Sequence, residues 1–463
     1  MIAPDLFAEL PDNLGRVHFI GIGGSGMSGI ARMFVDRGVS VSGSDRADSA
    51  TVKALRAIGV PIQIGHDPVA VQEADTVVVT GALWTDNPEY QWAIANGIRI
   101  LHRSNALNWL VRESRVVAVA GAHGKTTSTA MIVTALRAVG RDPSFVNGGV
   151  LADLGVSAGS GADSEFIIEA DESDGSFVMY PTALGLITNI DSDHLDHYGS
   201  ESAFEDAFVA FANGCNESVV VSGDDPTIVR LMPRFTRPIV TFGQSEGLDF
   251  RVADIRSTAD GVSARIFHAG EVGELRLAVA GAHNAVNATG AVAVLVSLGV
   301  PFGQACSALE QFRGTGRRFE LHGTVRGVRV YDDYAHHPRE VRAALDTARS
   351  VVGAGRVIAV HQPHLYSRTR DMAADFAREY ERGADFTIVL DVFGAREDPI
   401  EGVTGALVSA AFTDVEQVRF CPDWSEAAHV AAEYAREGDI IMTLSCGDVY
   451  RIIPTVLAEL ELG

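Results

Sequence analysis

The chain has 463 residues, of which 47% are hydrophobic and 21% are charged, and its formal net charge is -23 at pH 7. This composition is that of a globular protein, and the length predicts two or three domains because one hydrophobic core rarely covers so long a chain. The strong negative charge argues against a nucleic acid or an anionic membrane surface as a partner.

The sequence carries no signal for a membrane or for an oxidising compartment. No apolar run reaches transmembrane length, and the N-terminal segment has neither the basic start nor the apolar middle of a signal peptide. We therefore expect a cytoplasmic enzyme without membrane insertion. The cysteines are far apart and have no CxxC spacing, which predicts neither a zinc site nor a disulfide framework. They are Cys215, Cys306, Cys421 and Cys446.

Residues 1–110 alternate strand-like and helix-like segments, which predicts a Rossmann-like domain with a parallel sheet. Gly21, Gly23 and Gly26 form a G-x-G-x-x-G pattern after the strand-like VHFI, and Asp45 ends the next strand-like segment. This pattern is typical of dinucleotide-binding domains, so a dehydrogenase is one hypothesis. The same helix N-terminus can hold any pyrophosphate, including that of a nucleotide sugar.

A second glycine loop, GAHGKTTST at residues 121–129, separates the apolar run VVAVA from a helix-like segment. A strict Walker pattern requires a glycine at position 119, where the chain has Val119. Gly121 and Gly124 nevertheless offer backbone N–H groups, Lys125 can reach terminal phosphates, and the hydroxyl of Thr126 suits Mg²⁺.

Lysine usage supports a phosphate role for this loop. Only two of the 37 basic residues are lysines, Lys53 and Lys125. A compact ammonium on a phosphate is a role that the planar guanidinium of arginine fills poorly. A hydride-transfer enzyme has no use for a triphosphate cradle, so the second loop counts against the dehydrogenase hypothesis.

Residues 111–314 are predicted to form a central ATP-binding, P-loop domain with a small inserted β-meander. Two acidic clusters follow strand-like segments in this domain, as an Mg²⁺ bound to nucleotide phosphates requires. Glu169 and His194 head the two clusters and are the favoured ligands. The clusters also contain Asp171, Glu172, Asp174, Asp191, Asp193, Asp196 and His197. Their simpler interpretation is as helix caps and solvated loops, which we favour for Asp174, Asp196 and His197.

Residues 315–463 are predicted to form a third, Rossmann-like α/β domain. Pro338 is expected at the first position of a helix, and Asp332 or Asp333 could cap that helix. Arginines after a strand suit the capture of a carboxylate or phosphate, although a pair of surface cations is the simpler interpretation. The candidates are His364, Tyr366, Arg368 and Arg370.

From residue 17 to about 448, the chain resembles the Mur ligases. The resemblance is carried, in order, by HFIGIGGSGMSGIA, SGSD, VAGAHGKTT, FVNGG, EADESDGSF, TNIDSDHLDHY, GAHNAVNATGA, GTGRRFE, DDYAHHPREV and QPHLYSRTRD. It implies three domains that bind a UDP-sugar, ATP and an amino acid. It also implies that ATP, with Mg²⁺, phosphorylates the lactyl carboxylate of UDP-N-acetylmuramate, and that L-alanine attacks the acyl phosphate. The products are an amide, ADP and phosphate, in peptidoglycan precursor synthesis by a monomer or weak homodimer.

The resemblance also assigns roles to residues. Lys125 would stabilise the transferring phosphoryl group. Thr126 and Glu169 would hold one Mg²⁺, His194 would help to hold a second, and His364 with Arg368 would position alanine. The ATP-binding residues would be Gly121, Ala122, His123, Gly124, Lys125, Thr126, Thr127, Asn284, Asn287, Arg318 and Asp333. The UDP-sugar would contact Gly21, Gly23, Gly24, Ser25, Gly26, Met27 and Asp45.

The chain departs from parts of the family pattern. It has no lysine after Lys125, so it cannot use the carbamoylated lysine of the later ligases, and this favours the alanine-adding branch. Leu365 stands where some members have arginine, and Cys446 lies in a turn that is richer in glycine in relatives. A murein-peptide recycling ligase, which takes a tripeptide in place of alanine, and a catalytically silent regulator remain alternatives.

Overall fold

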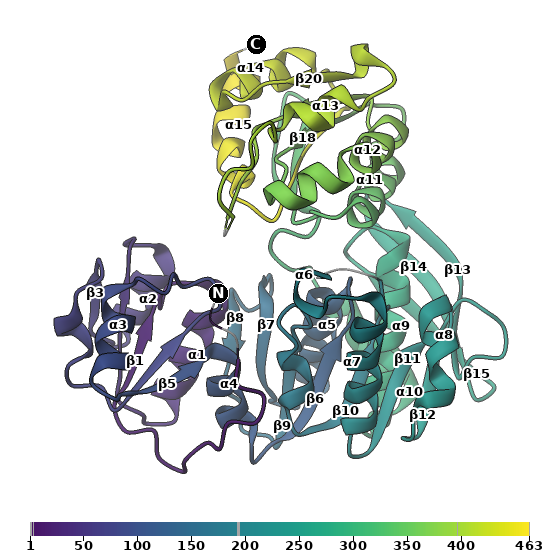
Figure 1. Ribbon diagram of the computed structural model, residues 1–463. Coiled ribbons are helices and arrows are strands. Elements are labelled where there is room, and N and C mark those ends of the chain that lie inside the picture. The colour runs from purple at the N-terminus through teal and green to yellow at the C-terminus, as the bar shows by residue number, and fades with distance from the viewer. Residues whose placement is uncertain (1, 3, 192–194, 396, 463) are drawn as a thin grey trace. The chain divides into compact units, whose positions relative to one another are not determined.

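The computed structural model describes residues 2, 4–191, 195–395 and 397–462 (Figure 1). It contains three sheets. The chain divides into two compact units, the first made of residues 1–253, 265–275 and 286–312, and the second of residues 254–264, 276–285 and 313–463. The first two sheets belong mainly to the first unit, and the third sheet belongs to the second unit.

The first sheet has five parallel strands in the order β3-β2-β1-β4-β5. Its strands are β1 (Val17–Ile20), β2 (Val41–Asp45), β3 (Ile62–Ile64), β4 (Thr76–Val79) and β5 (Arg99–His102). Its helices are α1 (Ser25–Asp36), α2 (Ala50–Ala57), α3 (Pro88–Ala95) and α4 (Arg103–Val111). The predicted Rossmann-like sheet is confirmed. The chain adds β2 and β3 on one side of β1 and then β4 and β5 on the other side, so the strand order reverses between β1 and β4.

The second sheet has ten strands in the order β15-β14-β13-β12-β11-β10-β6-β9-β7-β8. Its strands are β6 (Arg115–Ala120), β7 (Ser144–Leu151), β8 (Val156–Gly159), β9 (Glu165–Glu169), β10 (Thr182–Ile187), β11 (Ser218–Ser222), β12 (Ile239–Gly243), β13 (Phe250–Thr258), β14 (Gly261–His268) and β15 (Glu271–Leu277). Its helices are α5 (Lys125–Ala138), α6 (Leu195–Tyr198), α7 (Glu201–Gly214), α8 (Pro226–Leu231), α9 (Ala282–Ser297) and α10 (Phe302–Ala308). The predicted β-meander is β13, β14 and β15, at one edge of the sheet.

The third sheet has six strands in the order β16-β17-β21-β18-β19-β20, and all its pairs except β16 with β17 are parallel. Its strands are β16 (Glu320–Val325), β17 (Val328–Asp333), β18 (Val357–His361), β19 (Phe386–Val389), β20 (Val418–Phe420) and β21 (Ile440–Leu444). Its helices are α11 (Pro338–Val352), α12 (Tyr366–Gly383), α13 (Ala406–Ala410), α14 (Trp424–Tyr434) and α15 (Ile453–Leu462).

Pro338 begins α11 as predicted, but the cap of that helix is His337, whose ring accepts the N–H of Arg339 at 3.4 Å. The alternative in which an aspartate caps α11 is therefore wrong. The Asp333 carboxylate accepts the N–H groups of Phe319 and Ala335 instead, each at 2.8 Å.

The first two sheets share one hydrophobic core. Phe34 of α1 packs edge-on against Phe19 of β1 and stacks on Trp109 of α4, with ring centroids 5.6 and 5.2 Å apart. The same cluster of buried side chains continues into β6, β9 and α7 of the second sheet. A Cβ at Gly29 of α1 would lie 2.7 Å from the Cβ of Ala158 in β8, so glycine permits this close contact.

The 18-residue α12 has charged side chains along much of its length. Within the part of the chain that the structure describes, we find no helix with the length and apolar character that crossing a bilayer would need.

The core position of β9 leads to a stability prediction. Phe166 is fully buried in β9, whereas Val229 on α8 is 45% exposed. Phe166→Ala should lower the free energy of unfolding of the first unit by about 3 to 5 kcal/mol, because it leaves a cavity. The matched Val229→Ala variant should change it by about 0.5 kcal/mol or less. Urea unfolding followed by circular dichroism measures both, and equal effects would contradict this assignment of the core.

Candidate active site

The second glycine loop joins β6 to α5 at the centre of the larger sheet. Gly121 has a φ of +133°, and a Cβ there would collide with the hydroxyl of Thr188. Gly124, with a φ of +84°, is the left-handed N-cap of α5, and a Cβ there would lie 2.7 Å from Oδ1 of Asn287. Both positions require glycine for backbone conformation and for space. The predicted strand, turn and helix are present.

The segment after β10 holds the backbone of this loop. The N–H groups of Ala122 and His123 donate to the carbonyl oxygen and to Oδ1 of Asn189, at 3.2 and 2.9 Å. Asn189 Nδ2 donates in return to the carbonyl oxygen of His123 at 2.8 Å. Asp191 Oδ2 lies 3.3 Å from His123 Nε2. The TNID segment therefore fixes the loop as well as carrying acidic groups.

Lys125 folds back over the loop from the first turn of α5. Its Nζ donates to the carbonyl oxygens of Gly121 and Ala122 at 2.6 and 3.2 Å, and to Oε1 of Glu172 at 2.8 Å. Burial by itself would lower the pKa of Lys125, but the carboxylates of Glu172 and Glu169 raise it above its usual value. The ammonium therefore stays charged where terminal phosphates would meet the loop.

Glu172 is the buried partner of Lys125. Burial raises the pKa of Glu172 to about 7, although the charge of Lys125 opposes the shift. The hydroxyl of Tyr198 donates to the backbone carbonyl of Glu172 at 2.5 Å, which anchors the acidic loop after β9. The carboxyl group of Glu172 thus titrates near neutral pH, while Lys125 remains an ammonium.

Thr126 and Glu169 are brought together as predicted. The hydroxyl of Thr126 donates to Oε1 of Glu169 at 3.0 Å, and the N–H of Gly148 donates to Oε2 at 2.6 Å. A hydroxyl and a carboxylate beside a phosphate loop are hard oxygen ligands, so this pair fits Mg²⁺. His194, the third predicted ligand, lies outside the described residues, as does Asp193. Thr127 is half-buried on the next position of α5.

The first glycine loop joins β1 to α1. Gly21 has a φ of +76°, and Gly24 is the N-cap of α1. Met27, in the first turn of α1, has a buried side chain. The Asp45 carboxylate accepts the N–H of Gly23 at 2.8 Å and the N–H of Ala47 at 3.0 Å. Asp45 therefore closes the loop with the backbone. The predicted contact of Asp45 with a ribose hydroxyl stays a prediction.

Two asparagines predicted at the ATP site lie three positions apart in α9. Asn287 approaches the phosphate loop at Gly124, where its Oδ1 fills the space that a Cβ would need. Asn284 is buried, and its Nδ2 donates to the carbonyl oxygen of Ala280 at 2.7 Å. Asn284 therefore has a structural contact in the first turn of α9.

Asp333 ends β17 in the second compact unit. Burial raises the pKa of Asp333 to about 6, opposed by the charge of Arg318 and by two backbone N–H groups. The guanidinium carbon of Arg318 lies 5.0 Å from the ring centre of Tyr334. Phe319, whose N–H binds Asp333, has a φ of +48°, so this carboxylate also holds an unfavourable backbone conformation.

The candidate amino-acid contacts follow β18. Leu365 is the N-cap of α12 with a φ of +69°, a rare conformation for a branched residue, and its N–H donates to the carbonyl oxygen of Phe393. The ring of His364 stacks on that of Phe393 with centroids 5.8 Å apart. Arg368 lies half-buried in the first turn of α12. Arg370 forms an ion pair with its neighbour Asp371 on the surface, which agrees with the simpler interpretation of this arginine as a surface cation.

Cys446 lies among histidines at the end of β21. Burial would raise the pKa of its thiol, but the charge of His336 and hydrogen bonds from His336 and His364 lower it to about 6. The carbonyl groups on either side, those of Ser445 and Gly447, both accept hydrogen bonds from Arg317, at 2.6 and 3.0 Å. Arg317 therefore holds the turn that carries the thiol.

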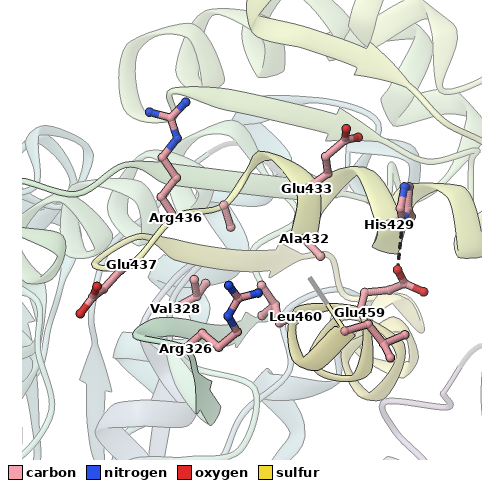
Figure 2. A pocket seen from close by; sticks show the side chains of 11 residues that line it. Arg326, Val328, His429, Ala432, Glu433, Arg436, Glu437, Glu459 and Leu460 are labelled. Carbon is pink, nitrogen blue, oxygen red and sulfur yellow. Dashed lines mark hydrogen bonds and ion pairs between the residues drawn. The ribbon is translucent and has the colours of Figure 1, made fainter.

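A separate pocket of about 780 Å³ lies in the second unit, beside α14 and α15 (Figure 2). An ion pair between His429 Nδ1 and Glu459 Oε2, at 2.9 Å, crosses its lining. The pocket lies near the amino ends of β17 and β21, whereas ligands of parallel sheets bind beyond the carboxyl ends. It contains none of the predicted site residues. Its lining consists of Arg326, Val328, His429, Ala432, Glu433, Ala435, Arg436, Glu437, Glu459, Leu460 and Leu462.

Several contacts have no signal in the sequence. Glu172 is one member of an acidic cluster, and nothing in the sequence indicates which carboxylate of that cluster meets Lys125. Asn189 gave no signal other than its place before the aspartates. Arg103, which binds Asp171 at 2.5 Å, gave none, because the two residues are 68 positions apart.

Comparison with protein-family models identifies the family to which the chain belongs. Three family models match in order: the Mur ligase family catalytic domain at residues 16–115, the Mur ligase middle domain at 119–295, and the Mur ligase glutamate ligase domain at 317–447. The chain belongs to the Mur ligase family, whose members are three-domain, ATP-dependent enzymes. This confirms the resemblance and the three-domain α/β fold.

Individual relatives are similar to the chain over nearly its whole length. The UDP-N-acetylmuramate–L-alanine ligase of Clavibacter michiganensis is 63% identical over 462 residues, covering 100% of this chain and 97% of that protein. The crystal structure of a UDP-N-acetylmuramate–alanine ligase from Thermotoga maritima matches with a TM-score of 0.82 at 28% identity, covering 96% of this chain and 98% of that one. A murein peptide ligase from Psychrobacter arcticus matches with a TM-score of 0.76 at 25% identity, covering 96% and 99%.

The surroundings of Cys446 lead to a prediction of its reactivity. Its pKa of about 6 makes it mostly a thiolate at pH 7, whereas burial raises the pKa values of Cys215 and Cys306 to about 12. Iodoacetamide should therefore alkylate Cys446 first, at a rate that rises with pH around a midpoint near 6. Peptide mass spectrometry after brief labelling measures this. A midpoint near that of a free thiol, about 8.5, would contradict the lowering of the Cys446 pKa by His336.

Proposed function

We propose that this protein ligates L-alanine to the lactyl carboxylate of UDP-N-acetylmuramate at the expense of ATP, and releases ADP and phosphate. The observation that carries the proposal is the position of Lys125 over a shortened phosphate loop, beside the Thr126 and Glu169 pair. The 63% identity to a ligase of that name over the whole chain supports the same reaction. Because ATP is the phosphoryl donor, we place the reaction in the cytoplasm. We also expect the protein to act as a monomer or weak homodimer.

In this proposal, the phosphate loop and α5 bind ATP. The backbone N–H groups at the start of α5 bind its phosphates, and Lys125 neutralises charge on the phosphoryl group that moves. Thr126 and Glu169 would hold one Mg²⁺ and His194 would help to hold a second, and these ions would supply positive charge to the phosphate oxygens. Asn287 lies against the same loop, and we assign it to ATP binding with Asn284, Arg318 and Asp333.

The other two substrates would bind at the remaining sheets. The first glycine loop would receive the diphosphate of the UDP-sugar at the N-terminus of α1, through the segment Gly21–Met27 and Asp45. His364 and Arg368 would position alanine, because a guanidinium binds a carboxylate through paired hydrogen bonds. The lactyl carboxylate would attack the terminal phosphorus of ATP, and the alanine amine would then displace phosphate from the acyl carbon.

A murein-peptide ligase is the second candidate, because such an enzyme shares the fold at a TM-score of 0.76. It would use the same sugar and a tripeptide in place of alanine. Product formation by chromatography, with ATP, Mg²⁺ and UDP-N-acetylmuramate, separates the two when L-alanine, L-serine, glycine or the tripeptide is supplied singly. We expect ADP formation that depends on L-alanine. Dependence on the tripeptide alone would contradict the proposal and assign the recycling reaction.

The role of Lys125 has a matched control in the only other lysine of the chain. Lys125→Ala should lower kcat by about a thousandfold or more, because a charge that stabilises the moving phosphoryl group is lost. The affinity for UDP-N-acetylmuramate, measured by calorimetry without ATP, should stay nearly unchanged. Lys53→Ala removes a lysine whose side chain is 66% exposed and should leave both quantities unchanged. Normal turnover in Lys125→Ala would refute the assigned role.

A further inference from the structure

Cys446 differs from the other cysteines of the chain in its exposure. All four lie in the described part of the chain and are free thiols, but Cys215, Cys306 and Cys421 are buried, whereas Cys446 is half-buried in the turn after β21. A thiol reacts with a reagent only where the reagent can reach it. Cys446 is therefore the cysteine that a small molecule can approach, and no second accessible thiol of the chain would displace a group attached to it.

The backbone of the turn is held on both sides of this thiol. Arg317, which precedes β16, binds the carbonyl oxygens of Ser445 and Gly447. Gln362, which follows β18, accepts the N–H of Asp448 at 3.1 Å through its Oε1. The turn is thus tied to two other segments of the second unit, so its backbone keeps the thiol at one position.

His336 and Glu340 continue from Cys446 as a row of thiol, imidazole and carboxylate. His336 forms a hydrogen bond with the thiol, and its Nδ1 lies 3.0 Å from Oε2 of Glu340 in the first turn of α11. Burial by itself would lower the pKa of His336, but the charges of Cys446 and Glu340 raise it well above its usual value. A nucleophile, a ring beside it and a third group that orients the ring are the arrangement that activates cysteine in covalent chemistry.

His364 is the second imidazole beside the thiol. It also forms a hydrogen bond with Cys446. The ring centres of His336 and His364 are 6.2 Å apart, with their planes at 71°. Stacking on Phe393 keeps the ring of His364 in place. Because the proposed function assigns alanine to His364, a group attached to Cys446 would take up space where alanine binds.

The other titratable or charged groups beside this cluster are Tyr334, Arg317 and Arg318. Burial and the charge of Cys446 raise the pKa of Tyr334, so its hydroxyl is neutral at pH 7. The guanidinium carbons of both arginines lie 5.0 Å from the ring centre of Tyr334, and an arginine side chain does not lose its charge near neutral pH. Apart from burial, the pKa of the thiol therefore depends on the two histidines beside it.

We propose that Cys446 is a modification site that forms a mixed disulfide with low-molecular-weight disulfides, and that the adduct keeps alanine from His364. The thiolate attacks one sulfur of the disulfide, so a new sulfur–sulfur bond forms while the old one breaks. The sulfur of Cys446 is oxidised, and the other half of the reagent is reduced and leaves as a thiolate, which takes a proton from solvent. An external thiol reverses the exchange. The chemical step stands without the proposed function, whereas the loss of turnover rests on it.

The test treats the full chain with bis(2-hydroxyethyl) disulfide, a small uncharged probe, at pH 7. Peptide mass spectrometry measures which cysteine gains the hydroxyethylthio group, and ADP formation with ATP, Mg²⁺, UDP-N-acetylmuramate and L-alanine measures turnover. We expect Cys446 to be labelled first, turnover to fall in proportion to the labelled fraction, and dithiothreitol to restore it. The calorimetric affinity for UDP-N-acetylmuramate should stay unchanged, because its proposed loop lies in the first unit.

Two cysteine variants separate this modification from general effects of the reagent. Cys446→Ser should turn over like the unaltered protein and should keep that turnover in the presence of the disulfide. Cys421→Ala is the matched control in the same unit. Cys421 is buried in the core that contains α14 and α15, so this variant should be labelled and inhibited like the unaltered protein.

A third variant tests the positioning role of His336. His336→Gln removes the imidazolium, so the midpoint of the labelling rate with pH should move from near 6 towards about 8.5, the value of a free thiol. At pH 6 the rate should fall by about tenfold, because the thiolate fraction falls by more than its nucleophilicity rises. A merely structural role for His336 would leave this midpoint in place.

Each outcome has a definite meaning. Earlier labelling of another cysteine, or an equal loss of turnover in Cys446→Ser, would overturn the inference and leave the proposed function intact. Labelling of Cys446 with unchanged turnover would overturn the block at the alanine site. If the unlabelled protein formed no ADP in response to L-alanine, the proposed function would fail, while the site of labelling would still decide whether Cys446 is the modified residue.

Discussion

The buried ammonium of Lys125 is the constraint on which the arrangement of the first unit depends. A charge taken out of water is costly unless carbonyl oxygens and a carboxylate surround it. Meeting that requirement brings together the end of β6, the start of α5 and the acidic loop after β9. The parallel pairing of β6 with β9 and β10 makes this possible, because the carboxyl ends of the three strands lie at one edge.

The three sheets carry their candidate functional groups at equivalent positions. In each of them, candidate functional groups follow the carboxyl ends of parallel strands: the first glycine loop after β1, the phosphate loop after β6, and His364 and Asp333 around the ends of β18 and β17. The strands β14, β15 and β16 carry none of the predicted site residues. They extend two of the sheets at their edges, where they affect the site only through the elements they support.

Local patterns made most of the fold and the centre of the site predictable. Apolar runs followed by glycine-rich turns located β1 and β6, and the scarcity of lysine singled out Lys125. Long-range pairing was beyond the sequence. No local feature indicates that Arg103 reaches Asp171 or that Glu172, rather than its neighbours, meets Lys125, because both contacts depend on how β5 and β9 are placed by packing. The sequence did not indicate the N-cap of α11, because the imidazole of His337 occupies a position at which shorter side chains are usual.

The contact of Gly29 with Ala158 has a consequence for how the protein comes apart. The backbone of α1 presses against β8, and the aromatic cluster around Phe34 continues into the second sheet, so one apolar core joins residues 1–110 to the central domain. Such a junction behaves as one cooperative folding unit rather than as two modules on a linker. Cutting the gene between the first two sheets would yield fragments with exposed apolar faces, so the modularity suggested by three successive family models does not extend to folding.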